Sequence, residues 1–215
     1  MTYEELKIHL DLNEPIDVLK SIGKQIKDNE WFVICDDGDC HLFDNNGNDI
    51  DISKIKMLDE SLISKNVEKV IVPDSIVKIK HKTFAYCPKL KSIFIPDSVK
   101  YIGEFAFEWC EKLTTINIPD SIEYIGCGIF YDCMNLTSIN IPDSIKKIEK
   151  YTFVNCRKIT SISIPKSVEY IEHHVFYLCE NLKSLIFEGK TIDQVKSMEC
   201  YPFGLEDESI IKYIN

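Results

Sequence analysis

A 23-residue repeat constrains the fold of this chain more than any other feature of its sequence. Five units match one another at this shift without a gap, and four columns keep one residue type throughout. These columns are Pro73, Pro96, Pro119, Pro142 and Pro165; Ser75, Ser98, Ser121, Ser144 and Ser167; Ile79, Ile102, Ile125, Ile148 and Ile171; and Phe84, Phe107, Phe130, Phe153 and Phe176. A period of this length predicts a solenoid, because a single unit cannot bury its apolar side alone.

The first half of each unit predicts a short strand. In residues 90–112, Ile93 and Ile95 alternate with non-core positions, and Pro96 ends the strand because it lacks the N–H that a ladder needs. Stacking places equivalent strands side by side as a parallel sheet, about 4.8 Å apart. We expect six such strands, beginning near Val67, Leu90, Leu113, Leu136, Ile159 and Leu182.

The second half of the unit predicts a return to the core by a different route. Val99 and Ile102 indicate another short extended segment. Ala106, Phe107 and Cys110 have the spacing of one helical turn, so we expect a turn of helix that directs all three inward.

The unit LKSIFIPDSVKYIGEFAFEWCEK resembles the BspA-like leucine-rich-repeat family, whose pattern is LxxIxIPxSVxxIGxxAFxxC. The resemblance covers about residues 67–190. It implies adhesion or protein recognition without catalysis, in a family associated with bacterial surfaces, phages and protists, although a fold alone is a weak guide to function. The chain departs from the pattern at several positions where the family prefers Gly or Ala. Where Ala is replaced, we expect a looser turn. The replacements are Lys80, Glu149 and Glu172 for Gly, and Thr83, Ile129, Thr152 and Val175 for Ala.

The predicted fold class is α/β: a leucine-rich-repeat solenoid of parallel strands with short helical turns, closed by a cap at each end. Residues 67–190 form the solenoid, as five units and a final strand. Residues 1–66 form an N-terminal α+β cap or a small separate module, and residues 191–215 a C-terminal helical cap. Open solenoid ends would otherwise expose apolar side chains and unpaired strand edges.

The C-terminal segment carries a helix-start signal. Thr191 and Gln194 have the spacing of a capping box and predict a helix through about Glu199. We expect residues 201–204 to turn the chain into a final short helix near residues 207–214.

The N-terminal segment has no repeat. Apolar residues at helical spacing predict a helix within residues 14–28. Residues 31–35, 41–43 and 49–52 predict strands of a small meander, joined by turns rich in Asp, Asn and Gly.

Charge and hydropathy exclude several classes of function. The net charge is −10, and residues 1–66 carry 15 acidic side chains against 7 basic ones. An acidic chain of this kind disfavours a nucleic-acid binder, since binding of the phosphate backbone needs basic clusters. No apolar stretch is long enough for a membrane span, and the first residues lack the apolar region of a secretory signal. These features slightly favour the cytoplasm, while surface or virion association stays open.

The nine cysteines do not predict a disulfide scaffold. Five occupy one repeat column, at Cys87, Cys110, Cys133, Cys156 and Cys179, and we expect them to be buried, reduced thiols. Cys35, Cys40 and His41 lack the second ligand pair of a structural zinc site. The start of a calcium loop near Asp44 has no carboxylate at its twelfth position, Ile55. We therefore expect no metal and no cofactor, and no catalytic residues emerge.

Two surfaces are candidates for binding. One is the exposed side of the predicted sheet, which alternatively is a hydroxyl ladder chosen for solubility. Its candidate residues are Ser92, Phe94, Thr115, Asn117, Ser138, Asn140, Ser161 and Ser163, continued by Ser184 and Ile186. The other consists of aromatic and apolar residues at non-core turn positions, which alternatively shield the stack by packing between turns. The candidates there are Phe105, Trp109, Tyr131 and Tyr151, together with Tyr86, Tyr177 and Leu178.

Three functions follow from this sequence. The first is a non-catalytic module that binds a protein partner through a repeat surface. The second is a structural component, of a virion or cell surface, that self-associates through the aromatic turns. The third gives residues 1–66 an activity of their own, which the repeats only direct to a target.

Overall fold

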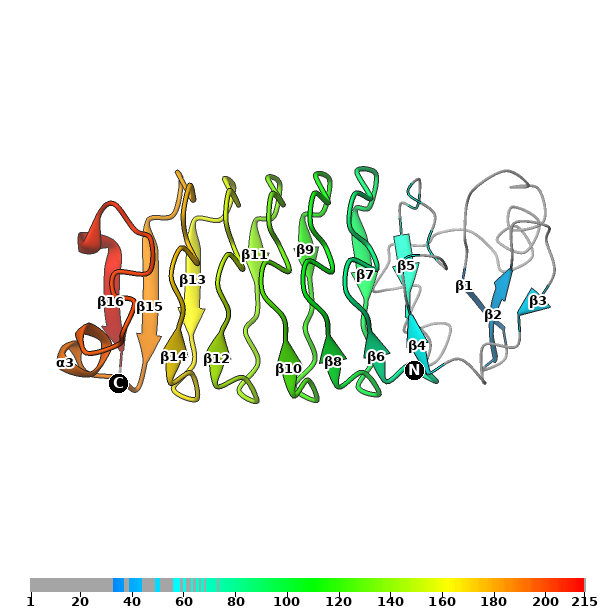
Figure 1. The fold of residues 1–215 in the computed structure, drawn as a ribbon, viewed down its shortest axis with the longest axis horizontal. Helices are drawn as coiled ribbons and strands as arrows, with labels where there is room; N and C mark the ends of the chain where they lie inside the picture. Colours follow the sequence, from blue (N-terminus) through cyan, green and yellow to red (C-terminus); the bar gives the residue numbers. More distant parts are fainter. Residues whose placement is uncertain are drawn as a thin grey trace.

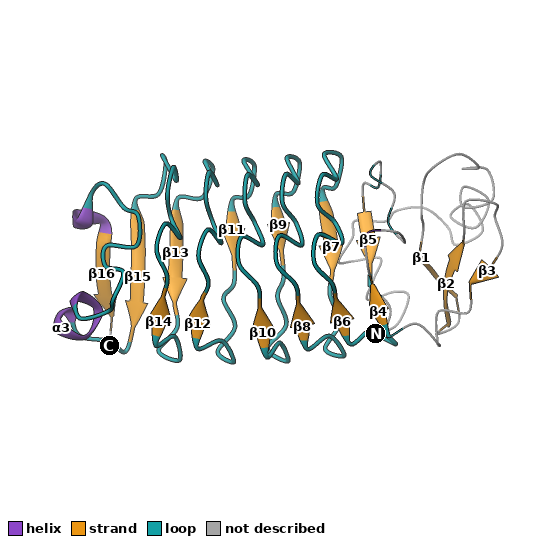
Figure 2. Cartoon of the chain, in the orientation of Figure 1, coloured by secondary structure: helices purple, strands orange, loops and turns teal. Residues whose placement is uncertain are grey.

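The computed structural model describes the backbone at residues 33–36, 39–43 and 49–50, and residues 56–214 except 59, 61, 62, 64, 66, 68 and 73. The described chain forms a stack of similar coils, with the C-terminal residues at one end (Figure 1). Figure 2 shows strands and turns along the described stack, and the helices that it colours lie at the C-terminal end. The helix predicted at residues 14–28 lies outside the described residues.

The first strand of every coil contributes to a parallel row, here called the first ladder. Its members are β5 (Lys69–Ile71), β7 (Ser92–Phe94), β9 (Thr115–Ile116), β11 (Ser138–Ile139), β13 (Ser161–Ile164) and β15 (Ser184–Glu188). Each begins two residues after its predicted start. Paired residues are 23 apart, as in Lys69 opposite Ser92, so the sequence period is also the register.

A second parallel row, the second ladder, confirms the other extended segment. It contains β4 (Met57–Leu58), β6 (Lys78–Ile79), β8 (Tyr101–Ile102), β10 (Tyr124–Ile125), β12 (Lys147–Ile148) and β14 (Tyr170–Ile171). β4 belongs to the segment that sequence assigns to the N-terminal module, yet it pairs in parallel with β6. The ladder therefore continues one strand beyond the recognisable repeats.

The turns between the ladders are not helical, so the predicted helical turn is wrong. Each contains two positions with positive φ, one at Lys82, Phe105, Gly128, Tyr151 and His174, the other at Tyr86, Trp109, Asp132, Asn155 and Leu178. The N–H groups of Phe105, Phe107 and Trp109 each donate over 2.9 Å to a carbonyl of the next coil. The left-handed backbone, which is unfavourable for L-residues, turns these donors outward along the stack. Ala106 and Cys110 are nevertheless buried, as the spacing predicts.

The core is a stack of identical side chains. Phe84, Phe107, Phe130, Phe153 and Phe176 are at most 2 % exposed, and successive ring centroids lie 5.4–5.8 Å apart with nearly parallel planes. The thiols of Cys110, Cys133, Cys156 and Cys179 each donate to a Phe carbonyl of an earlier coil, over 3.0–3.2 Å. All five column cysteines are free thiols.

The C-terminal segment confirms one element and corrects another. α3 (Ile192–Lys196) begins with the predicted capping box of Thr191 and Gln194, although it ends three residues before Glu199, and Val195 joins the core. The second helix is absent. After a 3-10 turn, η3 (Glu208–Ile210), the chain forms β16 (Ile211–Ile214), which pairs in parallel with β15. The open edge of β15 offers hydrogen bonds that a short isolated helix lacks.

The N-terminal meander is present at the level of the backbone. β1 (Val33–Asp36), β2 (Asp39–Phe43) and β3 (Asp49–Ile50) form a three-stranded antiparallel sheet. Cys35 lies opposite Cys40 in the register. Their side chains, and that of His41, are outside the described residues.

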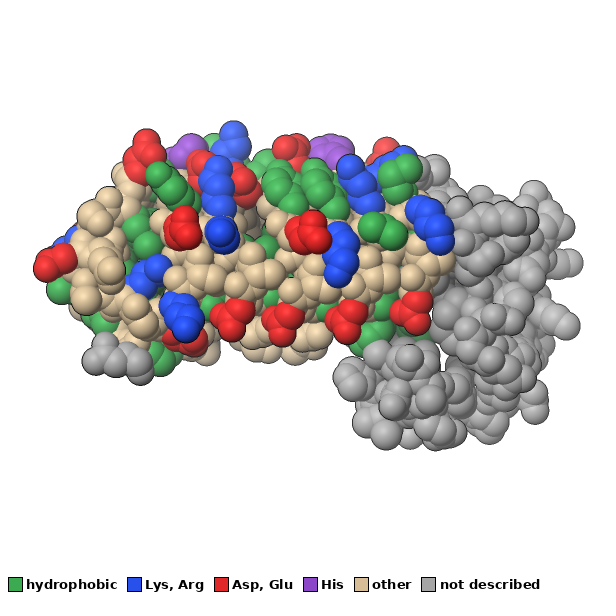
Figure 3. Space-filling model, turned by 90° about the horizontal axis from the view of Figure 1, so that it is seen from below, with side chains coloured by type: hydrophobic (Ala, Val, Ile, Leu, Met, Phe, Trp, Pro, Cys, Tyr) green, Lys and Arg blue, Asp and Glu red, His purple; other side chains and the backbone are tan. Residues whose placement is uncertain are grey.

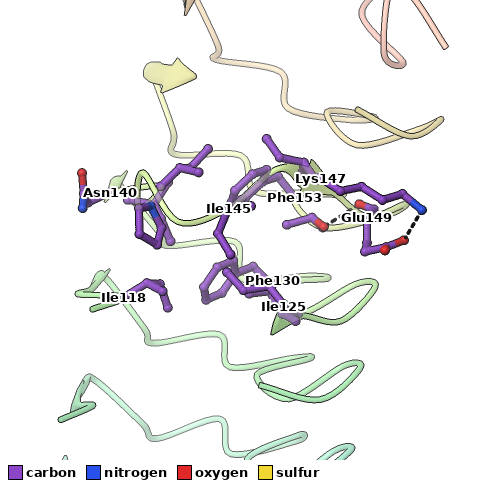
Figure 4. Close-up of a pocket in the computed structure, with 14 residues that line it drawn as sticks. Ile118, Ile125, Phe130, Asn140, Ile145, Lys147, Glu149 and Phe153 are labelled. Atoms are coloured by element: carbon purple, nitrogen blue, oxygen red, sulfur yellow. Dashed lines mark hydrogen bonds and ion pairs between the residues drawn. The ribbon is translucent and has the colours of Figure 1, made fainter. Parts of the chain in front are cut away.

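The second ladder is interrupted between β10 and β12, at the repeat position where Gly gives way to Glu149. A Cβ on Gly126, one repeat earlier, would lie 2.5 Å from the backbone nitrogen of Glu104, so these two coils approach more closely than a side chain allows. Lys80 and Glu172 occupy the same column, yet β6 pairs with β4 and β14 with β12, so a side chain at this position does not by itself interrupt the ladder. A small apolar cavity of about 20 Å³ lies beside the interruption. Figure 4 shows Ile125, Phe130 and Ile145 around it and the Lys147–Glu149 ion pair at one side. Ile129 and Thr152, which replace Ala, also line it.

Replacing Phe130 with Ala should lower the free energy of unfolding by about 3–5 kcal/mol, because an internal cavity opens in the core. Phe84→Ala should cost less, since Phe84 stacks on one Phe ring of the described core and Phe130 on two. Urea titrations of both variants check this. The reverse order would show that stability is not centred on the middle of the stack.

The column thiols should resist alkylation in the native protein and react once it is unfolded. Burial raises the pKa of Cys87 to about 11 and of Cys179 to about 12, so little reactive thiolate exists near neutral pH. Iodoacetamide treatment followed by peptide mass spectrometry checks each site. Cys127 and Cys200 are only half-buried and should react sooner. A mass two protons lower for a column pair would reveal a disulfide and contradict the packing described above.

Candidate functional site

Three surfaces run along the stack, and each repeats one set of side chains from coil to coil. The first-ladder face consists of the outward residues of β7, β9, β11 and β13 and of the residues that directly flank these strands. The second-ladder face consists of the outward residues of β6, β8, β10, β12 and β14. The turn ridge consists of the aromatic residues around the positive-φ positions. Because the coils are in register, the chemistry of each surface can be read column by column.

The first-ladder face is uncharged across its three central coils. No charged residue occurs in residues 113–119, 136–142 or 159–165. Its exposed members there are Thr114, Thr115, Asn117, Thr137, Ser138, Asn140, Thr160 and Ser161. Ser163, which is half-buried, donates a hydrogen bond to Glu188. The face therefore offers hydroxyl and amide groups on a regular backbone.

Larger apolar side chains flank this polar centre. Phe94 lies in the coil before it and Ile186 in the coil after it, both half-buried and both in the column of Asn117 and Asn140. All eight sheet residues proposed from sequence lie in this row, because strand alternation directs each of them outward. The structure thus brings the predicted sheet residues together on one face.

The second-ladder face has a column that sequence reasoning missed, namely Lys78, Tyr101, Tyr124, Lys147 and Tyr170. The ammonium of Lys78 lies 4.1 Å from the centroid of the Tyr101 ring, and the rings of Tyr101 and Tyr124 stack at 4.5 Å. Burial, and then the neighbouring Tyr101, raise the pKa of Tyr124. The signal for this column was available, because its members recur every 23 residues immediately before the invariant isoleucines of the repeat.

Charge on the second-ladder face is mixed. Lys147 pairs with Glu172 at 2.7 Å and Glu149 at 3.2 Å; the bond to Glu172 raises the pKa of Lys147 and lowers that of Glu172. Figure 3 shows a row of acidic side chains and a scatter of basic ones along the molecule. A separate acidic column lies in the turns between the two ladders and is exposed, namely Asp74, Asp97, Asp120 and Asp143.

The turn ridge is only partly a free surface. Phe105, Tyr131 and Tyr151 are half-buried, whereas Trp109 is 36 % exposed. Phe105 contacts Tyr131 edge-to-face at 6.4 Å, and the Trp109 ring stacks on that of Tyr86 at 6.3 Å. Tyr151 packs against two histidines of the following coil. The four predicted residues therefore form separate contacts between coils as well as an outer surface.

Among the described residues, no group of three or more His, Cys, Asp or Glu side chains could hold a metal ion. Among the same residues, no helix is long and apolar enough to cross a membrane.

The packing of the turn ridge can be tested at Gly128. Its φ is +60°, and a Cβ there would lie 2.4 Å from Cε1 of Phe105. Gly128→Ala should therefore destabilise the protein by about 1–2 kcal/mol from the backbone conformation alone, with a further cost from displacing the ring. Urea titration measures the loss.

A double-mutant cycle provides the control. If Phe105 packs over Gly128 as described, the cost of Gly128→Ala should shrink in a Phe105→Ala background. Equal costs in both backgrounds would mean that the Phe105 ring does not pack there.

Comparison with known proteins agrees with this geometry. The family model described as BspA type Leucine rich repeat region matches residues 77–203, in six copies. A search of the curated proteins finds no match. A leucine rich cell surface protein from Faecalibacterium prausnitzii is similar in structure, with 26% identity and a TM-score of 0.60 over 77% of this chain and 42% of that one.

A second similar structure is a leucine-rich repeat protein from T. pallidum, at 29% identity and a TM-score of 0.56, covering 60% of this chain and 61% of that one. A leucine-rich repeat protein from Eubacterium ventriosum shares the fold at 19% identity, with a TM-score of 0.58 over 89% of this chain and 53% of that one. The chain spans less than two thirds of the length of each of these proteins.

Proposed function

The chain belongs to the BspA-type leucine-rich-repeat family, and we propose that it is a non-catalytic module that binds a protein partner through its first-ladder face. The family is one of protein-interaction or surface modules, which supports recognition over catalysis. The matched structure from F. prausnitzii is a cell surface protein, and a surface role for this chain is part of the proposal.

The observation that carries the proposal is the absence of charge on the central first-ladder face. Interface cores are depleted in charged residues, because burying an unpaired charge is costly. Ser, Thr and Asn provide adaptable hydrogen bonds, as they do in antibody paratopes. Phe94 and Ile186 supply larger apolar contacts at the two ends of the same column. The regular backbone holds these groups in place before binding, which reduces the entropy lost on association.

A second candidate function is self-association through the turn ridge. Exposed apolar side chains favour it, because Tyr86 and Tyr177 are 52 % and 45 % exposed and Leu178 is 41 % exposed. Interface cores are enriched in such aromatic residues. The half-burial of Phe105, Tyr131 and Tyr151 weighs against a single continuous patch.

The division of the chain is also a proposal. Residues 1–66 would cap the N-terminal end, residues 67–190 would carry the recognition surface, and residues 191–215 would cap the C-terminal end with α3. The burial of Val195 in the core supports the C-terminal assignment. A separate activity in residues 1–66 stays a prediction, for which deletion of residues 1–55 is the direct experiment.

Two pairs of substitutions separate the surfaces. Asn117→Lys with Asn140→Lys places charge on the uncharged face and should weaken binding of a partner purified from the native host by about 2 kcal/mol or more, as loss of a hot spot does. Isothermal titration calorimetry measures this. The free energy of unfolding should change by less than about 0.5 kcal/mol, since both sites are exposed.

The contrasting pair is Trp109→Ala with Tyr131→Ala on the turn ridge, which should leave partner binding unchanged. Light scattering of the same variants measures self-association. If only the turn-ridge pair weakens binding, the first-ladder face is not the working surface. If that pair instead abolishes an oligomer of the unchanged chain, the assembly function is favoured.

A further inference from the structure

An open groove lies where the second-ladder face meets the C-terminal segment. Its volume is about 380 Å³. Glu169 and Tyr170 border it from the last coil, and Gln194, Met198 and Glu199 border it from α3 and the residues that follow. Tyr170 is 55 % exposed and is the most exposed tyrosine of its column.

The column that ends at Tyr170 indicates what this groove accepts. Further up the same column, the ammonium of Lys78 lies over the ring of Tyr101, whose other side stacks on Tyr124. The chain itself thus places a cation against a tyrosine ring on this face, an arrangement stabilised by the ring quadrupole. Tyr170 is the last tyrosine of the column. Among the described residues, no ring and no cation lies over it.

The charges around the groove favour the same occupant. Glu169 and Glu199 are exposed carboxylates that border it. The one basic residue in the lining, Lys190, donates from its ammonium to the carbonyl of Lys166 over 2.9 Å. The groove therefore presents a ring, two carboxylates and a thioether to a ligand. Among the described residues, no lysine forms an ion pair with either carboxylate.

We propose that this groove binds an arginine side chain from an extended basic segment of a protein partner. The guanidinium stacks on the Tyr170 ring while its N–H groups donate to Glu169 and Glu199. Arginine is preferred to lysine because its planar group stacks on a ring and donates in the plane at the same time. This inference rests on the proposed function, because it assigns an exposed arginine to the protein partner proposed above.

The experiment uses the full chain and the peptide Ac-Gly-Ser-Arg-Ser-Gly-NH2 in a titration followed by nuclear magnetic resonance of the 15N-labelled protein. The amide signals of Tyr170, Gln194 and Glu199 should shift saturably. Added salt should weaken the binding, because exposed charges are screened. The same peptide with citrulline in place of arginine keeps the shape without the charge and should not bind.

Variants test the assigned contacts. Tyr170→Ala should weaken peptide binding about three-fold or more, as expected for loss of an exposed cation–π contact, whereas Tyr170→Phe should bind like the unchanged chain. Glu199→Gln should weaken binding and reduce its dependence on salt. Glu206→Gln is the matched control for Glu199→Gln, since Glu206 is exposed and does not border the groove.

Three results would overturn the inference: equal binding of the citrulline peptide, shifts confined to other parts of the protein, or no shifts at all. The variant Asn117→Lys with Asn140→Lys leaves the groove intact and should bind the peptide normally. If a partner binds the first-ladder face while the arginine peptide fails, the groove assignment falls and the proposed function stands. If the peptide binds while the first-ladder variants leave partner binding unchanged, the groove assignment stands and the proposed function falls.

Discussion

The architecture depends on hydrogen bonds that each coil makes to its neighbour. In the turns, the N–H groups of Lys82, Phe84 and Tyr86 donate to carbonyls of the following coil over 2.7–3.0 Å, and the same pattern recurs one repeat later. In each turn, the N–H groups of every second residue point along the stack axis. This arrangement requires a left-handed backbone conformation at two positions per coil. That conformation is unfavourable in isolation. It persists because a buried N–H without a partner would cost more.

This dependence explains which parts of the fold the sequence predicts. The columns identify every buried face, because a residue that repeats at the same position has the same neighbours in each coil. Ala106, Phe107 and Cys110 are therefore inward as predicted, although their spacing suits a helix and the backbone is a non-helical turn. Periodicity along one chain contains no information about hydrogen bonds between coils. The strand β16 replaces the helix predicted near residues 207–214, because this segment carries no copy of the repeat that would indicate a strand of the stack.

The candidate site was predicted in part, and the failures have a physical cause. The residues of the first-ladder face lie in one row along the stack, as the alternation predicts, while their role in binding stays a prediction. The exposure of Phe105 and Tyr151 was overestimated, because the following coil covers part of each ring. The tyrosines of the second ladder were overlooked since only the isoleucines beside them carried a core signal. Exposure in a solenoid depends on the next coil as much as on the residue itself.

The contacts of a side chain in a solenoid also depend on the position of its coil along the stack. Tyr101 and Tyr124 belong to the same column as Tyr170, yet their rings stack on each other while Tyr170 faces a groove beside α3. In interior coils, outer side chains pack against those of the neighbouring coils, so both faces of an aromatic ring can be covered. Terminal coils have a neighbour on one side only, so the same residue type retains a free ring. Equivalent repeat positions can therefore acquire distinct binding properties at the end of the stack.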